Sequence, residues 1–367
     1  MILNEEQAML RETVAQFFTE KAPISELRSL TGAGDEQGYD SQLWSEMVEL
    51  GLPGITVPEA HDGLEFGWMG LGAIAQEAGR CLVASPLLSS VVLAQNLLLN
   101  CGSDAQIAIY LPSLMSGEAT ATVALDEERF FNPDAVATSE VSGALKGHKT
   151  RVLDVGQCSH IFCVAERASG ERGIAMFAPS AEGVTIGSRR MMDLHSADSI
   201  QLDGVSTEDV VWLAGDDVEG GIQRTIDQAT IVLAAEMMGS AREVLERTVA
   251  YLGEREQFDV KLGTFQALQH RCAHMYCELE LAESAVSAAL TALDHAGPNV
   301  SLLASSAKAL ANDCFTLISS EAVQLHGGMG VTEEMDIGLF LKRSRVCNQL
   351  LGGSSYHRDC YARLNGF

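Results

Sequence analysis

Two short motifs in the C-terminal third of the chain could bind a phosphate group. Arg255 stands in the segment ERxQF at the end of a long helical pattern, and a guanidinium can form paired hydrogen bonds with phosphate oxygens. Gly327 and Gly328 begin a GGxG motif, in which the flexible backbone can approach an anion and present free N–H groups. A surface ion pair for Arg255 and a helix C-cap for the glycines are simpler interpretations, and both stay open.

Two histidines, His270 and His274, have the spacing of a two-histidine metal site on a helix. No glutamate base stands between them, and we identify no third ligand nearby. We therefore interpret them as polar residues on a helix flank and expect no metal. The dinucleotide fingerprint GxGxxG, the Walker A motif and the nucleophile motif GxSxG are also missing from the sequence.

Three stretches of different character must position these residues. Residues 1–117 carry helical apolar stripes and capping motifs. Residues 118–215 consist of short β-branched or apolar runs between turn residues, which is typical of an antiparallel sandwich or barrel. Residues 216–367 carry long apolar stripes with short connections, which predict a four-helix bundle. The sequence therefore predicts an α+β protein with three domains at these boundaries.

The composition excludes some classes of partner and location. The chain has 367 residues and a net charge of −26, which argues against binding to nucleic acid or to an anionic membrane surface. Polar residues interrupt its most apolar stretch, residues 82–99, so we expect a buried helix there and no membrane span. Nine cysteines without a CxxC motif, and an N-terminus without a targeting pattern, favour the cytoplasm.

Several segments together resemble the acyl-CoA dehydrogenase family of flavoproteins. Residues 251–282 and 321–334 carry a pair of motifs similar to those of the family, and residues 43–67 are similar to its LGxxGxxxPExxGGxG segment. Residues 191–205 resemble the strand pair that closes its middle domain. The resemblance covers nearly the whole chain in order. It implies an N-terminal helical domain, a central antiparallel β-barrel or sandwich, a C-terminal four-helix bundle, and FAD as cofactor.

The resemblance also implies which residues hold FAD. Arg255 would meet the pyrophosphate, Phe258 would pack beside it, and Gln266 would lie along the cofactor. Gln324 and the Gly327-Gly328 backbone would reach the FAD of a neighbouring subunit. Because the cofactor site is shared in this way, the resemblance implies an oligomer.

The family reaction is the α,β-desaturation of an acyl-CoA thioester, in which a carboxylate removes the α-proton and the β-hydrogen leaves as hydride to flavin N5. The usual base is the glutamate of a YEGTSxxQ segment, and Gly352 stands at that position here. The second known base position, on the first long bundle helix, falls near Ala229. Glu236 lies on the same helix face about 10 Å further on and would serve only if the register slips, whereas Asp227 points away.

Gly352 and the LLGGSSYHR ending resemble the partner subunits of heteromeric acyl-CoA dehydrogenases, which act on dicarboxyl-, steroid- or ring-derived CoA thioesters. In such pairs one subunit brings the base and the other helps to hold FAD. In place of the family's TEPxAGSD flavin loop, this chain has the acidic residues Asp126, Glu127 and Glu128, which would put negative charge near the flavin ribityl or the CoA phosphates.

The resulting expectation is an FAD-dependent acyl-CoA dehydrogenase that works as a homo- or hetero-oligomer. The resemblance implies an acyl-CoA thioester as substrate and an electron-transferring flavoprotein as electron acceptor. Two alternatives stay open: a self-sufficient flavoenzyme of this fold with an unusual base, and a non-catalytic structural paralogue. The sequence does not predict the acyl group.

Overall fold

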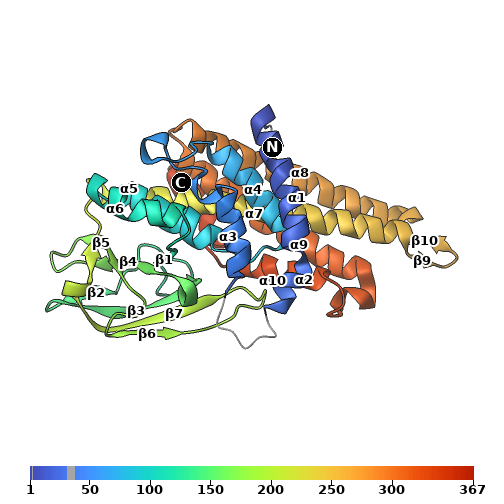
Figure 1. Cartoon of the computed structure of the whole chain (residues 1–367). Helices are drawn as coiled ribbons and strands as arrows, with labels where there is room; N and C mark the ends of the chain where they lie inside the picture. Colours follow the sequence, from blue (N-terminus) through green and yellow to red (C-terminus); the bar gives the residue numbers. More distant parts are fainter. Residues whose placement is uncertain (2, 31–37) are drawn as a thin grey trace. The chain divides into compact units, whose positions relative to one another are not determined.

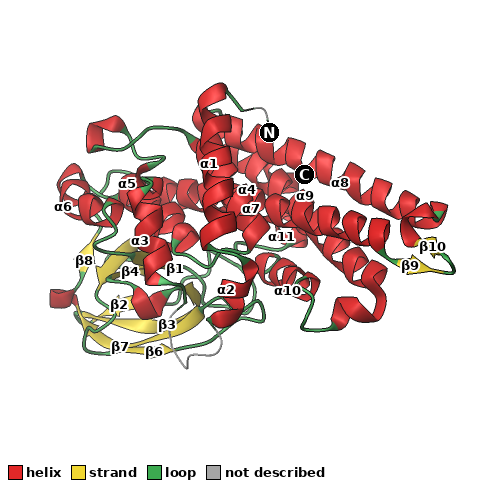
Figure 2. Ribbon diagram, turned by 45° about the vertical axis from the view of Figure 1, so that its right-hand side comes forward, coloured by secondary structure: helices red, strands yellow, loops and turns green. Residues whose placement is uncertain are grey.

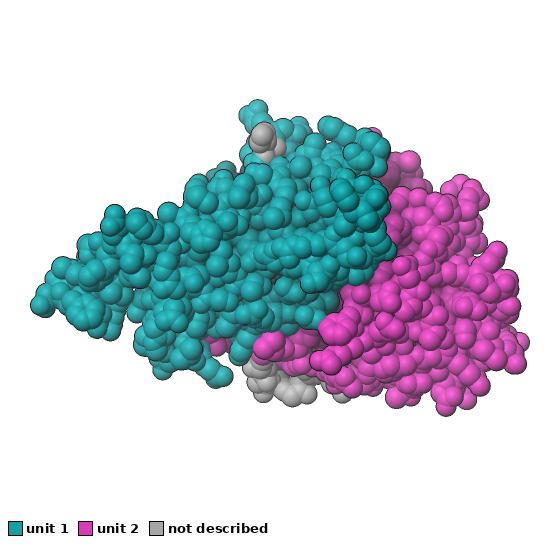
Figure 3. Space-filling view, turned by 180° about the vertical axis from the view of Figure 1, so that it is seen from behind, with its two compact units in different colours: residues 1–26, 67–83, 230–367 teal, residues 27–66, 84–229 magenta. Residues whose placement is uncertain are grey.

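The computed structural model describes residues 1, 3–30 and 38–367, which form two compact units. The first unit contains residues 1–26, 67–83 and 230–367, and the second contains residues 27–66 and 84–229 (Figure 3). Figure 1 labels the elements along the chain. The three predicted domain boundaries stay a prediction, while the predicted α+β class with helices, then a sheet, then helices is confirmed.

The first unit is helical except for one short hairpin (Figure 2). Its helices are α1 (Glu5–Lys21), α4 (Trp68–Cys81), α7 (Val218–Glu254), α8 (Gln266–Asp294), α9 (Val300–His326), α10 (Ile337–Cys347) and α11 (Ser354–Leu364), with the start of α7 belonging to the second unit. Strands β9 (Glu256–Gln257) and β10 (Val260–Lys261) form the hairpin between α7 and α8. Helix α9 packs against α8, α10 and α11 and is therefore the central helix of the predicted bundle.

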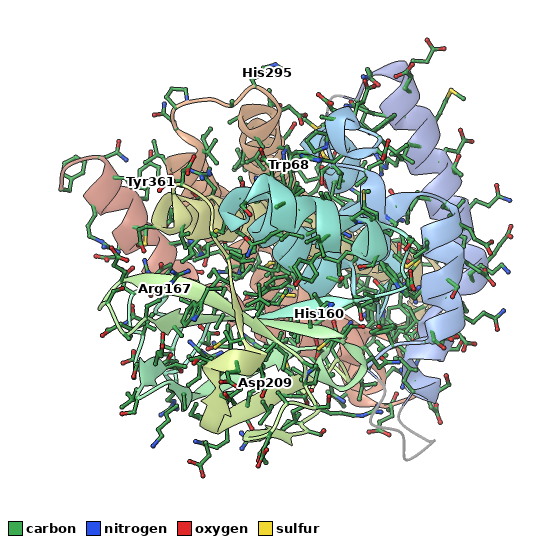
Figure 4. All side chains as sticks on the ribbon, turned by 60° about the vertical axis from the view of Figure 1, so that its left-hand side comes forward. Trp68, His160, Arg167, Asp209, His295 and Tyr361 are labelled. Atoms are coloured by element: carbon green, nitrogen blue, oxygen red, sulfur yellow. The ribbon has the colours of Figure 1, made fainter. Side chains whose placement is uncertain are left out.

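Close contacts and caps fix the helices of this unit. Helices α4 and α7 meet at Gly79 and Gly239, where an added Cβ would lie only 2.0 and 1.8 Å from backbone oxygens of the opposite helix. The carboxylate of Asp294, at the end of α8, accepts hydrogen bonds from the backbone N–H groups of Trp68 and Met69, at the start of α4. It thereby supplies the N-cap that Gly67 cannot provide (Trp68 and the following His295 are labelled in Figure 4).

The second unit combines short helices with the sheet. Its helical elements are α2 (Ile24–Ser29, which begins in the first unit), α3 (Ser41–Glu49), a π-helix (Leu87–Gln95), α5 (Asn96–Cys101) and α6 (Asp104–Met115). Ser103 and Gln106 form a capping box at the start of α6, and Asn4 and Gln7 form one at the start of α1, which agrees with the capping motifs of residues 1–117. No helix within the described ranges is long and apolar enough to cross a membrane.

The sequence predicted an antiparallel sandwich or barrel, and most strand pairs of the second unit's sheet are antiparallel, but two pairs are parallel and make the sheet mixed. Its strands are β1 (Ala121–Ala124), β2 (Ser139–Val141), β3 (Ala144–Leu153), β4 (His160–Glu166), β5 (Arg172–Phe177), β6 (Val184–Gly187), β7 (Ala197–Ser206) and β8 (Val211–Trp212). They follow the order β6-β7-β3-β2-β4-β5-β8, and β1 and β2 both pair with β4 in parallel. Parallel pairs need crossover connections, which short strand patterns do not reveal.

The core of the sheet is apolar, with Leu145, Ile161, Ala175 and Leu202 all fully buried or nearly so. At its edge, the guanidinium of Arg167, labelled in Figure 4, lies 4.8 Å from the centre of the Trp212 ring and donates a hydrogen bond to the carbonyl of Leu213. These contacts attach β8, the last strand before α7, to the rest of the sheet.

Candidate functional site

Arg255 follows the last residue of α7 and begins the β9–β10 hairpin. Its backbone N–H donates to the carbonyl of Tyr251, and its carbonyl accepts from the N–H of Leu262, the residue just after the returning strand. The two turn residues, Phe258 and Asp259, have φ values of +56° and +61°, as a tight hairpin with a right-handed twist requires. The Arg255 side chain is exposed and makes no ion pair with any described residue, although the chain has 50 acidic residues. This cation is therefore available for an anionic ligand.

Phe258 and Gln266 lie at the same end of the first unit as Arg255. The Phe258 side chain is 84% exposed at the hairpin tip, and its ring meets the edge of Phe265 at a centroid distance of 6.2 Å. Phe265 is the N-cap residue of α8, so Gln266 begins that helix and is exposed as well. The hairpin and the start of α8 thus present an aromatic ring and an amide at the same end of the unit as the guanidinium.

The Gly327-Gly328 pair directly follows α9. Gly327 is the C-cap that the sequence predicted, with φ +60° and ψ −140°, and its N–H donates to the carbonyl of Gln324. An added Cβ on either glycine would have no heavy atom within 4 Å, and both residues are exposed. Packing within the unit therefore does not require the second glycine, which leaves its backbone open to a ligand.

A contact between Tyr251 and His326 brings the Arg255 hairpin and the Gly327-Gly328 pair together. No local sequence pattern indicates this contact. Their rings stack at 4.3 Å with an interplanar angle of 23°. The Nδ1–H of His326 donates to the carbonyl of Ala322, and burial lowers the pKa of this histidine, so the ring is neutral at pH 7. The stack joins the end of α7 to the end of α9, four residues before Arg255 and one before Gly327.

These residues fit a flavin nucleotide by their chemistry. A guanidinium that no carboxylate of the described residues uses can bind a pyrophosphate, and the open glycine backbone can donate N–H groups to an anion or approach a flat ring. Arg255, Phe258, Gln266, Gln324, Gly327 and Gly328 all lie in the first unit and are all exposed. Exposure of the whole set suits a site that a second subunit completes.

Two of the three acidic residues at positions 126–128 are paired with cations within the second unit. The carboxylate of Glu127 lies 2.6 Å from Nζ of the fully buried Lys149, and that of Asp126 lies 3.0 Å from Nε of Arg151. Burial would raise the pKa of Glu127, but Lys149 and two backbone N–H groups outweigh it and lower that pKa. The negative charge expected at this loop is therefore mostly offset, because Lys149 and Arg151 lie on β3, some 20 residues further along.

Glu236, the candidate base, is engaged in an ion pair. Its Oε1 accepts hydrogen bonds from Nε and Nη2 of Arg343 at 2.9 and 2.6 Å. The Arg343 side chain is 6% exposed and that of Glu236 is 18% exposed. A carboxylate held by a buried guanidinium favours the structural interpretation of Glu236, and its role in catalysis stays a prediction.

The two family positions for the base cannot be filled by a small change. Ala229 is fully buried in α7. Gly352 has φ +101°, and a Cβ there would lie 2.5 Å from the Tyr356 ring and 2.9 Å from Nε2 of His357. This backbone therefore rejects a glutamate at position 352, on both conformational and steric grounds.

The histidine pair has no metal-site geometry. His270 and His274 are exposed on α8, and Nδ1 of His274 lies 3.8 Å from the carboxylate of Glu278. Among the described residues, no group of three or more His, Cys, Asp or Glu side chains could hold a metal ion.

Comparison with known proteins gives a consistent result. A family model described as "Acyl-CoA dehydrogenase, N-terminal domain" matches residues 4–118, and one described as "Acyl-CoA dehydrogenase, C-terminal domain" matches residues 220–364. The chain is 32% identical to acyl-CoA dehydrogenase IpdE2 of Mycobacterium tuberculosis over 348 residues, which cover 95% of this chain and 93% of the relative.

Two further proteins are similar to nearly the whole chain. Caffeyl-CoA reductase-Etf complex subunit CarC of Acetobacterium woodii is 27% identical over 371 residues, covering 94% of each chain. A solved structure of a variant of the "Tcur3481-Tcur3483 steroid ACAD" is similar with a TM-score of 0.88 and 28% identity over 98% of both chains.

Proposed function

The chain belongs to the acyl-CoA dehydrogenase family, and on that premise we propose that it is the partner subunit of a heteromeric enzyme, which helps to hold FAD while another chain supplies the catalytic base. As a family member it is a flavin oxidoreductase with FAD as its cofactor. When bound, FAD supplies the hydride acceptor for the β-hydrogen of the substrate. The proposed reaction is the α,β-desaturation of an acyl-CoA thioester.

The observation that carries the proposal is the backbone at Gly352. A left-handed φ of +101° and the short distances to Tyr356 and His357 make this position unsuitable for any side chain. Because no glutamate fits at this position, the closed space supports a site in which a different chain supplies the carboxylate.

In this proposal each residue of the chain has a limited task. Arg255 donates hydrogen bonds to the pyrophosphate of FAD, and the Gly327-Gly328 backbone and Gln324 contact the FAD of a neighbouring subunit. Phe258 excludes water beside the pyrophosphate, which strengthens those hydrogen bonds. Glu236 stays paired with Arg343 and transfers no proton.

Similarity to two proteins supports the quaternary and redox parts of the proposal. The name of the steroid ACAD structure joins two proteins, Tcur3481 and Tcur3483, and CarC is named as a subunit of a caffeyl-CoA reductase-Etf complex. We therefore infer a second dehydrogenase chain as the partner and an electron-transferring flavoprotein as the electron acceptor. The cytoplasmic location expected from the cysteines belongs to the same proposal.

The test is to purify the chain alone and together with a candidate dehydrogenase chain that keeps the glutamate of the YEGTSxxQ segment. Both samples are assayed with butyryl-, octanoyl- and glutaryl-CoA and a steroid side-chain CoA thioester, using an artificial electron acceptor. The proposal expects little activity from the chain alone and strong activity from the pair. Activity of the chain alone that Glu236→Gln removes would establish the self-sufficient alternative, and a pair without flavin absorbance would establish the non-catalytic one.

A further inference from the structure

Lys308 is a buried lysine with an unusual set of partners. It lies in α9 and is fully buried. Its Nζ donates hydrogen bonds to the carbonyl of Cys347 at 2.8 Å, to Oδ1 of Asn312 at 2.8 Å and to the carbonyl of Gly352 at 3.2 Å. An ammonium group has three N–H bonds, so these three oxygens satisfy it without any carboxylate.

Two of these oxygens lie at the two ends of one short segment, residues 348–352, and the third belongs to Asn312 of α9 itself. Cys347 is the last residue of α10, where the carbonyl end of the helix carries partial negative charge. The Gly352 carbonyl is at the other end of the segment, and Nδ2 of Asn312 also donates to it at 3.3 Å. A single ammonium therefore ties the end of α10 to the residue that stands at the family's base position.

The backbone between these ties is strained. Leu351 has φ +55° and Gly352 has φ +101°, and the left-handed region is unfavourable for leucine. The carbonyl of Leu351 accepts a hydrogen bond of 2.8 Å from Nε2 of His357, on α11. Buried donors from α9 and α11 thus hold two consecutive carbonyls. The unfavourable backbone conformation persists because several independent hydrogen bonds stabilise it.

The charged and titratable groups that face this cluster are Glu236 on α7, Arg343 and Cys347 on α10, and His357 on α11. Burial lowers the pKa of Lys308 to about 7, Cys347 and Glu236 act to raise it, and Arg343 acts to lower it. Burial and the nearby Lys308 lower the pKa of His357 to about 4, so this histidine donates to Leu351 as a neutral ring.

We propose that Lys308 is a positioning residue, which together with Asn312 and His357 fixes residues 348–352 in the one backbone shape that excludes a side chain at position 352. That this segment lies beside the acyl-CoA substrate depends on the proposed function. That buried donors fix the segment depends only on the hydrogen bonds described above.

The first test measures backbone amide hydrogen exchange in the complex of this chain with its partner. Lys308→Met is expected to speed exchange in peptides covering residues 347–357 at least tenfold, with peptides of α8 unchanged. Asn312→Ala, which leaves the lysine in place, is expected to give a smaller effect in the same peptides. The matched control is Lys149→Met with Glu127→Gln, which removes an equally buried lysine from the second unit and should leave residues 347–357 unaffected.

The second test compares kinetic constants for the best thioester of the panel named above. Lys308→Met should raise KM about tenfold and change kcat less than threefold, with the flavin spectrum unchanged. The reason is that displacement of residues 348–352 weakens the binding of the substrate and of the transition state equally. Unchanged exchange at residues 347–357, or equally faster exchange throughout the bundle, would overturn the proposal. An inactive wild-type complex with the expected exchange pattern would instead overturn only the proposed function.

Discussion

Gly352→Ala is expected to destabilise the chain by about 2–4 kcal/mol, since it adds a Cβ to a left-handed residue in a closed space. Urea unfolding measures this change. The control is Gly253→Ala, in the last turns of α7, where an added Cβ meets nothing within 4 Å and should stabilise by up to about 1 kcal/mol. Equal effects of the two variants would mean that position 352 has room.

Arg255→Ala is expected to weaken FAD binding by the assembled enzyme about 10- to 100-fold, the worth of one or two charge-assisted hydrogen bonds. The flavin absorbance that survives gel filtration, and titration of the stripped protein with FAD, measure this loss. Arg363→Ala serves as control, because that arginine is exposed on α11 and pairs with Asp359 and Cys360 of its own helix. Full flavin retention in Arg255→Ala would remove Arg255 from the cofactor site.

Single residues differ in how much of their role the sequence predicts. The sequence shows that a glycine, Gly352, stands where the family has its glutamate. The +101° φ and the ring atoms around that position depend on the turn after α10 and on α11, so no local pattern indicates them. Likewise, the C-cap at Gly327 could be predicted from a local pattern, whereas two partners of Lys308 lie 39 and 44 residues further along the chain.

At the scale of elements, the order of helices, sheet and bundle follows from the sequence, but the links between elements do not. The apolar stripes predicted α7, α8 and α9, and capping patterns predicted the starts of α1 and α6. The hairpin after Arg255 escaped prediction because its strands have only two residues each. The parallel pairing of β1 with β4 escaped it because pairing depends on residues far apart in the chain.

The Glu236–Arg343 pair joins α7 to α10, and we expect the two residues to be strongly coupled. Arg343→Gln should destabilise the chain by about 2–4 kcal/mol because it leaves a largely buried carboxylate without its cation. Adding Glu236→Gln should recover at least about 1 kcal/mol of that loss. A double-mutant cycle in urea makes the comparison, and additive effects would mean that the pair contributes no coupling between the helices.

The Lys308 cluster, which joins α9, α10 and α11, predicts a specific pH dependence of stability. The folded pKa of Lys308 is about 7 and the ordinary value is 10.5, so between these limits the unfolded chain binds a proton that the folded chain does not. The free energy of unfolding should therefore rise with pH across this window, relative to Lys308→Met, and the difference should become constant well below pH 7.

Between pH 7 and 8.5 the wild type should gain about 2 kcal/mol over the Lys308→Met variant. Denaturant unfolding of both proteins in matched buffers measures the difference, which cancels the contributions of the other titrating groups. Parallel curves for the two proteins would show that the folded lysine titrates near its ordinary pKa.

The whole chain is strongly acidic, yet its candidate cofactor site contains a cation that forms no ion pair with any described residue. With 24 basic and 50 acidic residues, most cations are expected to be paired, and Arg80, Arg151, Arg242 and Arg343 are. Arg255 is one of several cations for which the described residues supply no ion pair, Arg129 and Lys261 being others, so its position in the candidate site is what singles it out. The acidic loop at residues 126–128, in contrast, carries little unpaired negative charge, because Lys149 and Arg151 form ion pairs with two of its three carboxylates.

The central claim is that the catalytic base comes from another chain. The most direct test mixes the purified two-chain enzyme anaerobically with the best thioester of the panel and follows the absorbance of oxidised flavin near 450 nm in a single turnover. We predict rapid bleaching that Gln in place of the partner's YEGTSxxQ glutamate slows at least a thousandfold, and that Glu236→Gln slows less than tenfold. Bleaching that persists without the partner's glutamate but disappears in Glu236→Gln would contradict the account.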